Sequence, residues 1–526
     1  MGKDILVAID RSQGFNKQAL SKNIIFSVVT FVLNTFISFF ITPYISDRFG
    51  SDIYGYVKLA NDFANYASLF SIALNSMASR FIMLERVRGD QKRANQYFSS
   101  VAIANIILSL IFIIPSAICV YYLDDFFEIN PALIFEVKLT FALTFLNFIV
   151  RLLFSIYSNC YYITNTLYIQ SLRQAQASII NVVLVLVLFM VFEPHISYVV
   201  LGTLAATLFT AGVNLYYTRR LVPDLRFCRS DFDFKCIKDI LSSGIWNSIT
   251  QLSQILTSGL DLILTNLFIT PQMMGYMSIA KTIPNVIFSF NTTIASVFSP
   301  NLMQLYAKGD TEGLKNTAKS SMRFMCLFVS IPNAILCTMG AAFYRLWVPG
   351  QPAQLIHIMS ILTVINTCIS GPLQPLYQIF TITNKVRINS IVMIIYGLVN
   401  ICCVAILLKL TDWGVYAILG CSLAGALIVA FFFHIPYSAK FIGLPKTAFV
   451  PEILKSVFSF IAVSAVGLLI TLLFDTSASW FAWFSAAIVT AIIGFAINFT
   501  VVLTRQEKQK LHAFASRKLR QILRKG

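Results

Sequence analysis

The stretch that decides the fold is residues 55–90, GYVKLANDFANYASLFSIALNSMASRFIMLERVRGD, which returns as residues 275–310, GYMSIAKTIPNVIFSFNTTIASVFSPNLMQLYAKGD. Both copies begin with Gly-Tyr and end with Gly-Asp, at a constant displacement of 220 residues. Between these ends the copies agree at Ala60/Ala280, Asn65/Asn285, Phe70/Phe290, Ser76/Ser296, Ser79/Ser299 and Met83/Met303. Unrelated sequences agree at roughly one position in fifteen, so the match indicates an internal duplication. Further along, Ile163-Thr164-Asn165 returns as Ile382-Thr383-Asn384, now displaced by 219 residues.

The composition of the chain is that of a membrane protein. It is 57% hydrophobic and only 12% charged, whereas soluble domains are roughly 25% charged. The net charge of +17 would suggest nucleic acid in a soluble protein, but the basic residues lie between apolar runs, where they set orientation in a bilayer. We therefore expect no nucleic-acid partner. The cysteines form no Cys-x-x-Cys motif, and no His/Cys cluster has zinc spacing, so no metal site is expected.

The apolar runs predict an all-α polytopic fold with about fourteen transmembrane helices. The repeat divides them into two pseudo-symmetric six-helix bundles followed by two additional helices. The predicted spans of the first bundle are 23–45, 54–79, 97–122, 133–158, 171–192 and 196–218. Those of the second are 240–269, 276–303, 322–343, 355–383, 388–408 and 413–436, and the added pair is 452–473 and 479–503. A count of twelve or thirteen applies if a Pro-containing run such as 355–383 is partly re-entrant.

These spans predict six regions along the chain. They are an amino-terminal cytoplasmic segment (1–22), a first bundle (23–218), a basic connector (219–239), a second bundle (240–436), two added helices (437–503) and a basic tail (504–526). Lys and Arg are abundant in alternate loops, while the opposite loops hold little more than Arg48, Arg345 and Lys409. Because basic loops remain cytoplasmic, both termini are predicted to be cytoplasmic. An even number of spans in each half makes the repeats parallel, with a substrate path at their interface.

Charged residues inside the spans are the candidate functional residues, because a charge at mid-bilayer costs about 2.5–3.5 kcal/mol. The candidate cations are Lys58, Arg151 and Lys281, and the candidate ion-coupling acids are Asp62 and Asp261. Simpler explanations stay open. Lys58 and Asp62 are four residues apart and could neutralise each other, Arg151 could reach the interface, and Asp261 could form a salt bridge across the bundle.

Aromatic residues near these charges are candidates for stacking on sugars. They are Tyr56, Tyr66, Tyr157, Trp246 and Tyr276, and ordinary packing is the alternative for each of them. Helices 240–269 and 276–303 also carry many hydroxyl and amide side chains, so we expect them to line water or each other. No phosphate-binding Gly-x4-Gly-Lys motif is present, and the four histidines form no catalytic pattern. We predict that the protein is not an enzyme and needs no cofactor.

The basic tail from Arg505 to Gly526 places Leu511, Phe514, Leu519, Ile522 and Leu523 among Lys and Arg residues. This pattern predicts an amphipathic helix on the anionic inner leaflet, with a solvated tail as the alternative.

The segment Arg48-Phe49-Gly50-Ser51-Asp52-Ile53-Tyr54-Gly55 resembles the polysaccharide and O-antigen flippases of the multidrug/oligosaccharidyl-lipid/polysaccharide (MOP) exporter superfamily. The duplication, the two added helices and the basic loop ending in Gly-Asp are similar to that family along nearly the whole chain. The resemblance implies a MATE-like fold in the bacterial inner membrane. It implies a flippase for undecaprenyl-diphosphate-linked oligosaccharide units of O-antigen, capsule or exopolysaccharide, working by alternating access.

The same resemblance implies proton or sodium coupling, membrane lipids as surroundings, and polysaccharide polymerase and chain-length proteins as partners. Lys58, Arg151 and Lys281 match the cations of the family's lumen in kind but not through a position-specific motif. The alternatives are a peptidoglycan lipid II flippase and a cation-coupled multidrug exporter, for which acidic residues would be expected in the first bundle. A membrane scaffold without transport is a third class.

Overall fold

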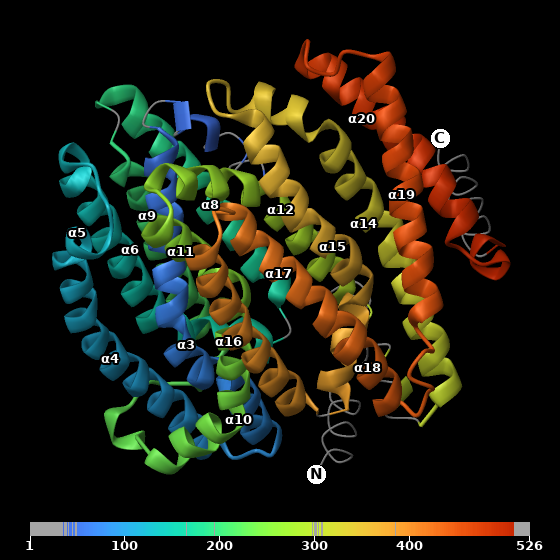
Figure 1. Cartoon of the computed structure of the whole chain (residues 1–526). Helices are drawn as coiled ribbons and strands as arrows, with labels where there is room; N and C mark the ends of the chain where they lie inside the picture. Colours follow the sequence, from blue (N-terminus) through green and yellow to red (C-terminus); the bar gives the residue numbers. More distant parts are fainter. Residues whose placement is uncertain are drawn as a thin grey trace, which may run out of the picture. The chain divides into compact units, whose positions relative to one another are not determined.

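All secondary structure in the described residues is helical (Figure 1). The computed structural model describes residues 50–296 except 165 and 194, residues 298, 302, 305 and 306, residues 309–509 except 384, and isolated residues between 35 and 47. The predicted segment 1–22, most of the predicted span 23–45 and the tail beyond residue 509 lie outside this range. The chain divides into two compact units, Met1–Gly275 and Tyr276–Gly526.

The first unit contains the longer helices α3 (Ser51–Val87), α4 (Gln91–Tyr121), α6 (Ile134–Phe154), α8 (Leu167–Val191), α9 (Ser197–Leu221) and α10 (Phe234–Gln254). Its shorter helices are α5 (Leu123–Phe126), α7 (Asn159–Ile163) and α11 (Asp261–Phe268), with turns η1 (Pro131–Leu133), η2 (Ser155–Ser158), η3 (Arg229–Asp231) and η4 (Ile255–Gly259). The turn η4 is a π-helix. The predicted span 240–269 is therefore not one helix but α10 and α11 separated by a π turn.

Helix α12 (Pro271–Ser296) begins at the end of the first unit and continues into the second. The second unit then contains α14 (Thr311–Trp347), α15 (Ala353–Ile382), α16 (Val386–Leu410), α17 (Val415–Val429), the π turn η5 (Ala430–His434), α18 (Ile435–Phe441), α19 (Val450–Leu473) and α20 (Trp480–Val501). Helix α15 is continuous through Pro372 and Pro375, so the re-entrant alternative for this segment is wrong.

Eleven helical segments in the described part of the chain are long and apolar enough to cross a membrane. The predicted spans 240–269 and 276–303 are not among them. The first is broken at Leu260, between η4 and α11, and the second corresponds to α12, whose described part carries Lys281, Asn285 and Asn291. With these two segments and the span 23–45, the prediction of about fourteen spans is roughly consistent with the structure.

The repeated Gly-Asp pair makes the same turn in both units. Gly89 and Gly309 have positive φ angles of 83° and 71°, a conformation that glycine adopts without steric cost. Each following aspartate then caps a helix. Asp90 accepts a hydrogen bond from the Arg93 N–H at 2.9 Å, and Asp310 accepts one from the Gly313 N–H at 2.8 Å. The pair therefore ends one helix and begins the next, which explains why both residues recur.

The polar residues of α10 bind α3 in the first unit. Asn247 Nδ2 donates to Ser76 Oγ at 3.0 Å, and Ser248 Oγ donates to the Leu69 carbonyl at 2.7 Å. We expected these residues to face water or helix 276–303. Instead, two of them hydrogen-bond to α3, as polar side chains do between helices in lipid.

The basic connector packs against the start of α4. The N–H groups of Cys228 and Asp233 donate to Ser99 Oγ and Ser100 Oγ at 3.1 and 2.9 Å. Arg86, at the end of α3, lies 3.7 Å from Asp224. Two segments that the sequence analysis predicted to be cytoplasmic therefore meet at one end of the first unit.

In the second unit, buried polar side chains join α14, α19 and α20. Asn498 Nδ2 donates to Ser330 Oγ at 2.7 Å, and Ser459 Oγ donates to Asn498 Oδ1. Trp483 Nε1 donates to the Met339 carbonyl at 3.1 Å. Because lipid cannot satisfy these groups, the hydrogen bonds fix α19 and α20 against α14.

Candidate functional site

Both predicted acids and one predicted tyrosine lie beside the π turn of the first unit. The Tyr66 hydroxyl, on α3, donates to the carbonyl of Gly259, the last residue of η4. Asp62 lies one helical turn before Tyr66, Asp261 opens α11, and both carboxylates interact electrostatically with the Tyr66 hydroxyl. Asp261 is only 4% exposed. Two residues of α3 and one of α11 thus form one acidic cluster. We call it the Tyr66 cluster (Asp62, Tyr66 and Asp261).

The sequence could indicate these acids but not their convergence. The π turn η4 ends two residues before Asp261, and a π turn adds a residue to the helical repeat. Tyr66 stabilises this turn from the neighbouring helix by binding its last carbonyl. Turns of this type are frequent at functional sites.

The cations Lys58 and Arg151 form no ion pair with any described residue. Lys58 is half-buried, and its ammonium lies 5.4 Å from the centroid of the Tyr54 ring. It does not pair with Asp62, so the two residues do not neutralise each other in this structure. Arg151, in the last turn of α6, is exposed, and its guanidinium lies 5.9 Å from the centroid of the Phe148 ring.

Among the predicted aromatics, Tyr56 is packed in the interior of the first unit. Its ring is 2% exposed, and its hydroxyl donates to the Glu128 carbonyl. A ring buried in this way presents no face to a sugar in this conformation. Tyr157 is half-buried in η2, where its ring packs edge-on against Phe98 with centroids 5.6 Å apart. Trp246 is half-buried on α10.

Tyr276 and Lys281 belong to the second unit, and both are half-buried on α12. The other predicted site residues all belong to the first unit. The structure therefore brings together Asp62, Tyr66 and Asp261, and it leaves Lys58 and Arg151 as separate cations.

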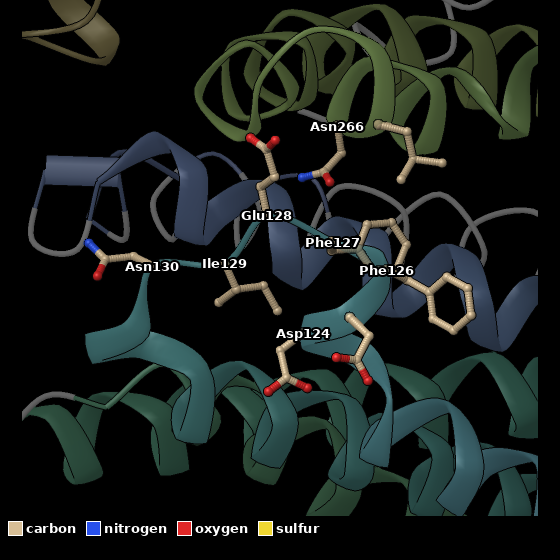
Figure 2. A pocket seen from close by; sticks show the side chains of 9 residues that line it. Asp124, Phe126, Phe127, Glu128, Ile129, Asn130 and Asn266 are labelled. Carbon is tan, nitrogen blue, oxygen red and sulfur yellow. The ribbon is translucent and has the colours of Figure 1, made fainter.

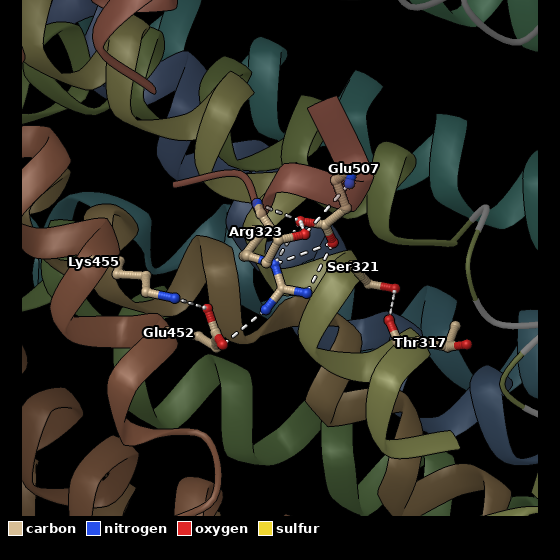
Figure 3. Close-up of polar contacts among 7 residues, drawn as sticks. Thr317, Ser321, Arg323, Glu452, Lys455 and Glu507 are labelled. Atoms are coloured by element: carbon tan, nitrogen blue, oxygen red, sulfur yellow. Dashed lines mark hydrogen bonds and ion pairs between the residues drawn. The ribbon is translucent and has the colours of Figure 1, made fainter. Parts of the chain in front are cut away.

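The sequence reasoning missed an ion-pair cluster in the second unit (Figure 3). Arg323, on α14, donates from Nε and Nη2 to Glu507 at 2.8–3.1 Å and from Nη1 to Glu452 at 2.8 Å. All three side chains are largely buried. Glu507 also accepts a hydrogen bond from the Thr504 N–H at 2.9 Å, and this Thr-x-x-Glu spacing is that of a capping box. The capping box was visible in the sequence, but its arginine partner was not.

Burial opposes ionisation of the Glu507 carboxyl, but the hydrogen bonds from Arg323 and Thr504 outweigh it. Together they lower the pKa of Glu507 to about 2. Glu507 is therefore a carboxylate at all physiological pH values and holds the segment after α20 on α14 and α19.

A second missed feature is a pocket of about 640 Å³ in the first unit (Figure 2). It is lined by residues 124–130, between α4 and α6, and by Asn266 and Leu267 at the end of α11. Three of the lining residues are acidic. Within the described part of the chain, no three His, Cys, Asp or Glu side chains converge as a metal site.

Comparison with known proteins agrees with an all-helical membrane fold. Residues 20–306, more than half of the chain, match the model of the family described as "Polysaccharide biosynthesis protein". The chain therefore belongs to the polysaccharide biosynthesis protein family, as the sequence resemblance implied. It is 27% identical over 490 residues to the "Uncharacterized membrane protein EpsK" of Bacillus subtilis (strain 168), covering 92% of this chain and 95% of that one.

Solved structures of the MOP superfamily share the fold. A lipid II flippase MurJ in an inward closed conformation matches with a TM-score of 0.60 and 14% identity, covering 90% of this chain and 98% of the other. An inward-facing multidrug resistance transporter of the MATE family matches with a TM-score of 0.58 and 15% identity, covering 80% and 98%. The MATE-like fold predicted from the sequence is confirmed. This is a multi-pass membrane protein of a polysaccharide biosynthesis family with a transporter fold, and neither the family nor these neighbours are catalytic enzymes.

Proposed function

We propose that the protein is a flippase that moves undecaprenyl-diphosphate-linked oligosaccharide units across the bacterial cytoplasmic membrane, for O-antigen, capsule or exopolysaccharide synthesis. The family and the fold support a transporter in polysaccharide synthesis. The observation that carries the proposal is the environment of Arg151. The Arg151 side chain is an exposed guanidinium in a membrane-spanning helix, without an ion pair to any described residue. Such a charge is costly unless it faces a polar path or binds an anion, and a diphosphate is such an anion.

In this mechanism the diphosphate enters a cationic path that uses Lys58, Arg151 and Lys281, while the polyprenyl chain remains in lipid. Rocking of one repeat against the other then alternates access to the two sides. The orientation has both termini in the cytoplasm. It is supported by the basic segments 86–93 and 219–238, which meet at one end of the first unit.

The Tyr66 cluster is our candidate for ion coupling. Two carboxylates beside one half-buried phenol, within the predicted spans, are groups that can bind a proton or a sodium ion. In a two-step cycle, loading and release of this ion would alternate with loading and release of the glycolipid. Asp62→Asn and Asp261→Asn should each abolish the dependence of transport in vesicles on the imposed proton or sodium gradient.

Depletion of the protein tests the substrate class. Loss of surface polysaccharide with normal peptidoglycan synthesis supports the proposal, whereas loss of peptidoglycan synthesis supports the lipid II alternative raised by the fold. Complementation then tests the cations. Arg151→Ala, Lys58→Ala and Lys281→Ala should each lower surface polysaccharide, while Lys409→Ala, which removes an exposed charge from the last turn of α16, should not. A scaffold without transport predicts full complementation by all four variants.

A further inference from the structure

The acidic pocket of the first unit is lined by carboxylates, amides and phenylalanine rings. It lies where α4 and α6 are joined and where α11 ends, with its lining shown in Figure 2. In the orientation proposed above, this end of the unit faces the outside of the membrane. The pocket is thus placed where a glycan would arrive after crossing. This inference rests on the proposed function and concerns a different site from the cationic path.

Two of the three carboxylates in the pocket are not neutralised by a described residue. Lys138 Nζ lies 2.5 Å from Asp124 and also donates to the Tyr121 carbonyl at 2.8 Å. That contact lowers the pKa of Asp124, and the Lys138 ammonium neutralises the charge of the Asp124 carboxylate. Asp125 and Glu128 have no ion pair among the residues that the structure describes. The pocket therefore keeps a negative charge, which repels anionic sugars and attracts an ammonium group.

Asn266 provides an independent sign of a missing ligand. Its side chain is 2% exposed and lines the pocket, yet neither amide atom has a hydrogen bond to a described residue. The Tyr56 hydroxyl lies beside it, but its proton goes to the Glu128 carbonyl, so it offers no donor to Oδ1 of Asn266. A buried amide without partners costs about 1–3 kcal/mol. A ligand that both donates and accepts hydrogen bonds, as a sugar hydroxyl does, would remove this cost.

The pocket also contains an exposed aromatic ring. Phe126 lines the pocket and is 69% exposed, so its ring is available to stack on the apolar face of a sugar. Its neighbour Phe127 is buried and packs edge-on against Phe63, with centroids 6.0 Å apart. Tyr56 holds the same segment, residues 124–130, through its hydrogen bond to the Glu128 carbonyl. The segment 124–130 is therefore held in place at Phe127 and Glu128, while the Phe126 ring projects outward.

We propose that this pocket binds a neutral or amino-bearing sugar residue of the exported glycan. Carboxylates accept hydrogen bonds from its hydroxyl or ammonium groups, Asn266 exchanges hydrogen bonds with a hydroxyl, and Phe126 stacks on the ring. Anionic sugars are excluded by Asp125 and Glu128.

The test is saturation-transfer NMR on the full chain in nanodiscs, with glucosamine, glucose and glucuronate as probes. The expected order of affinity is glucosamine, then glucose, then glucuronate. Glu128→Gln should weaken glucosamine binding about tenfold, the equivalent of one charged hydrogen bond, and leave glucose binding less affected. Asp412→Asn, which removes an exposed carboxylate of another loop, should change nothing.

Two more variants protect the test against misfolding. Asn266→Leu should abolish binding of glucosamine and glucose, and size-exclusion profiles establish whether it folds. Phe126→Ala alters an exposed side chain, so this variant should fold normally. It should still weaken the binding of both glucosamine and glucose. Absence of transfer from every probe, preference for glucuronate, or unchanged binding in Phe126→Ala would overturn the proposal. Because binding is measured on purified protein, these outcomes are independent of the polysaccharide assays that test the flippase function.

Discussion

Gly55 and Gly275 lie face to face where α3 and α12 begin. A Cβ atom on Gly55 would be 3.1 Å from the Gly275 Cα, and a Cβ atom on Gly275 would clash with the Ser51 carbonyl oxygen. The two glycines that mark the start of each repeat copy are therefore in contact. Only residues without side chains allow helix backbones to approach this closely.

We predict that Gly275→Ala separates these helix ends and lowers stability by about 1–3 kcal/mol, the usual cost of overpacking. SDS-induced unfolding in mixed micelles measures the change. Gly212→Ala is the matched control, because Gly212 is also helical and its Cβ would meet nothing within 4 Å. That control should be neutral or slightly stabilising, since alanine favours a helix over glycine. Equal destabilisation by both variants would contradict the packing explanation.

Glu507→Gln should destabilise the second unit. It leaves the largely buried Arg323 guanidinium with Glu452 as its remaining carboxylate, at an expected cost of about 2 kcal/mol. Glu312→Gln is the control, because the Glu312 side chain is exposed and its contact with Lys315 is 3.5 Å long. Limited proteolysis at the carboxyl terminus offers a second measurement, since loss of the ion pair should release the segment that follows α20. An unchanged proteolysis rate would count against this role of Arg323.

The same carboxylate predicts a pH dependence. The pKa of Glu507 is lowered to about 2 from 4.5, so its contribution to stability is fully present above pH 4.5. It is lost as the pH falls from 4.5 through about 2, because protonation removes the charge that binds Arg323. Unfolding of the wild type and of Glu507→Gln should differ at pH 7 and converge at the acid end of this range. A constant difference between pH 5 and pH 2 would show that the charge of Glu507 is not the cause.

Tyr56→Phe should loosen the strip between α4 and α6. The variant keeps the buried ring and loses only the hydrogen bond to the Glu128 carbonyl, at an expected cost of about 1 kcal/mol. Hydrogen exchange at residues 127–130 should accelerate, while exchange in α8 should not change. Tyr162→Phe, which alters an exposed tyrosine of the same unit, is the control.

The sequence predicted the helices well because each span is a long apolar run. It missed the interruption of 240–269, and the Tyr66 hydroxyl that binds the π turn there comes from another helix, so the contact is not visible in the segment's own sequence. The acids Asp62 and Asp261 were chosen for their cost in lipid, and the structure places both near Tyr66. Arg323 escaped notice because its partners are 129 and 184 residues away in sequence. Asn266 escaped because an unpartnered amide becomes visible only once its surroundings are known.

The hydrogen bonds of Asn498 and Ser330 have a consequence for where the chain can be shortened. They join α20 to α14 in the interior, and Arg323 joins α14 to α19 and to the segment after α20. A chain cut before α19 would leave Ser330 without Asn498, and it would leave Arg323 without Glu452 and Glu507. The helices beyond the duplicated halves are therefore needed to satisfy polar groups of the second half.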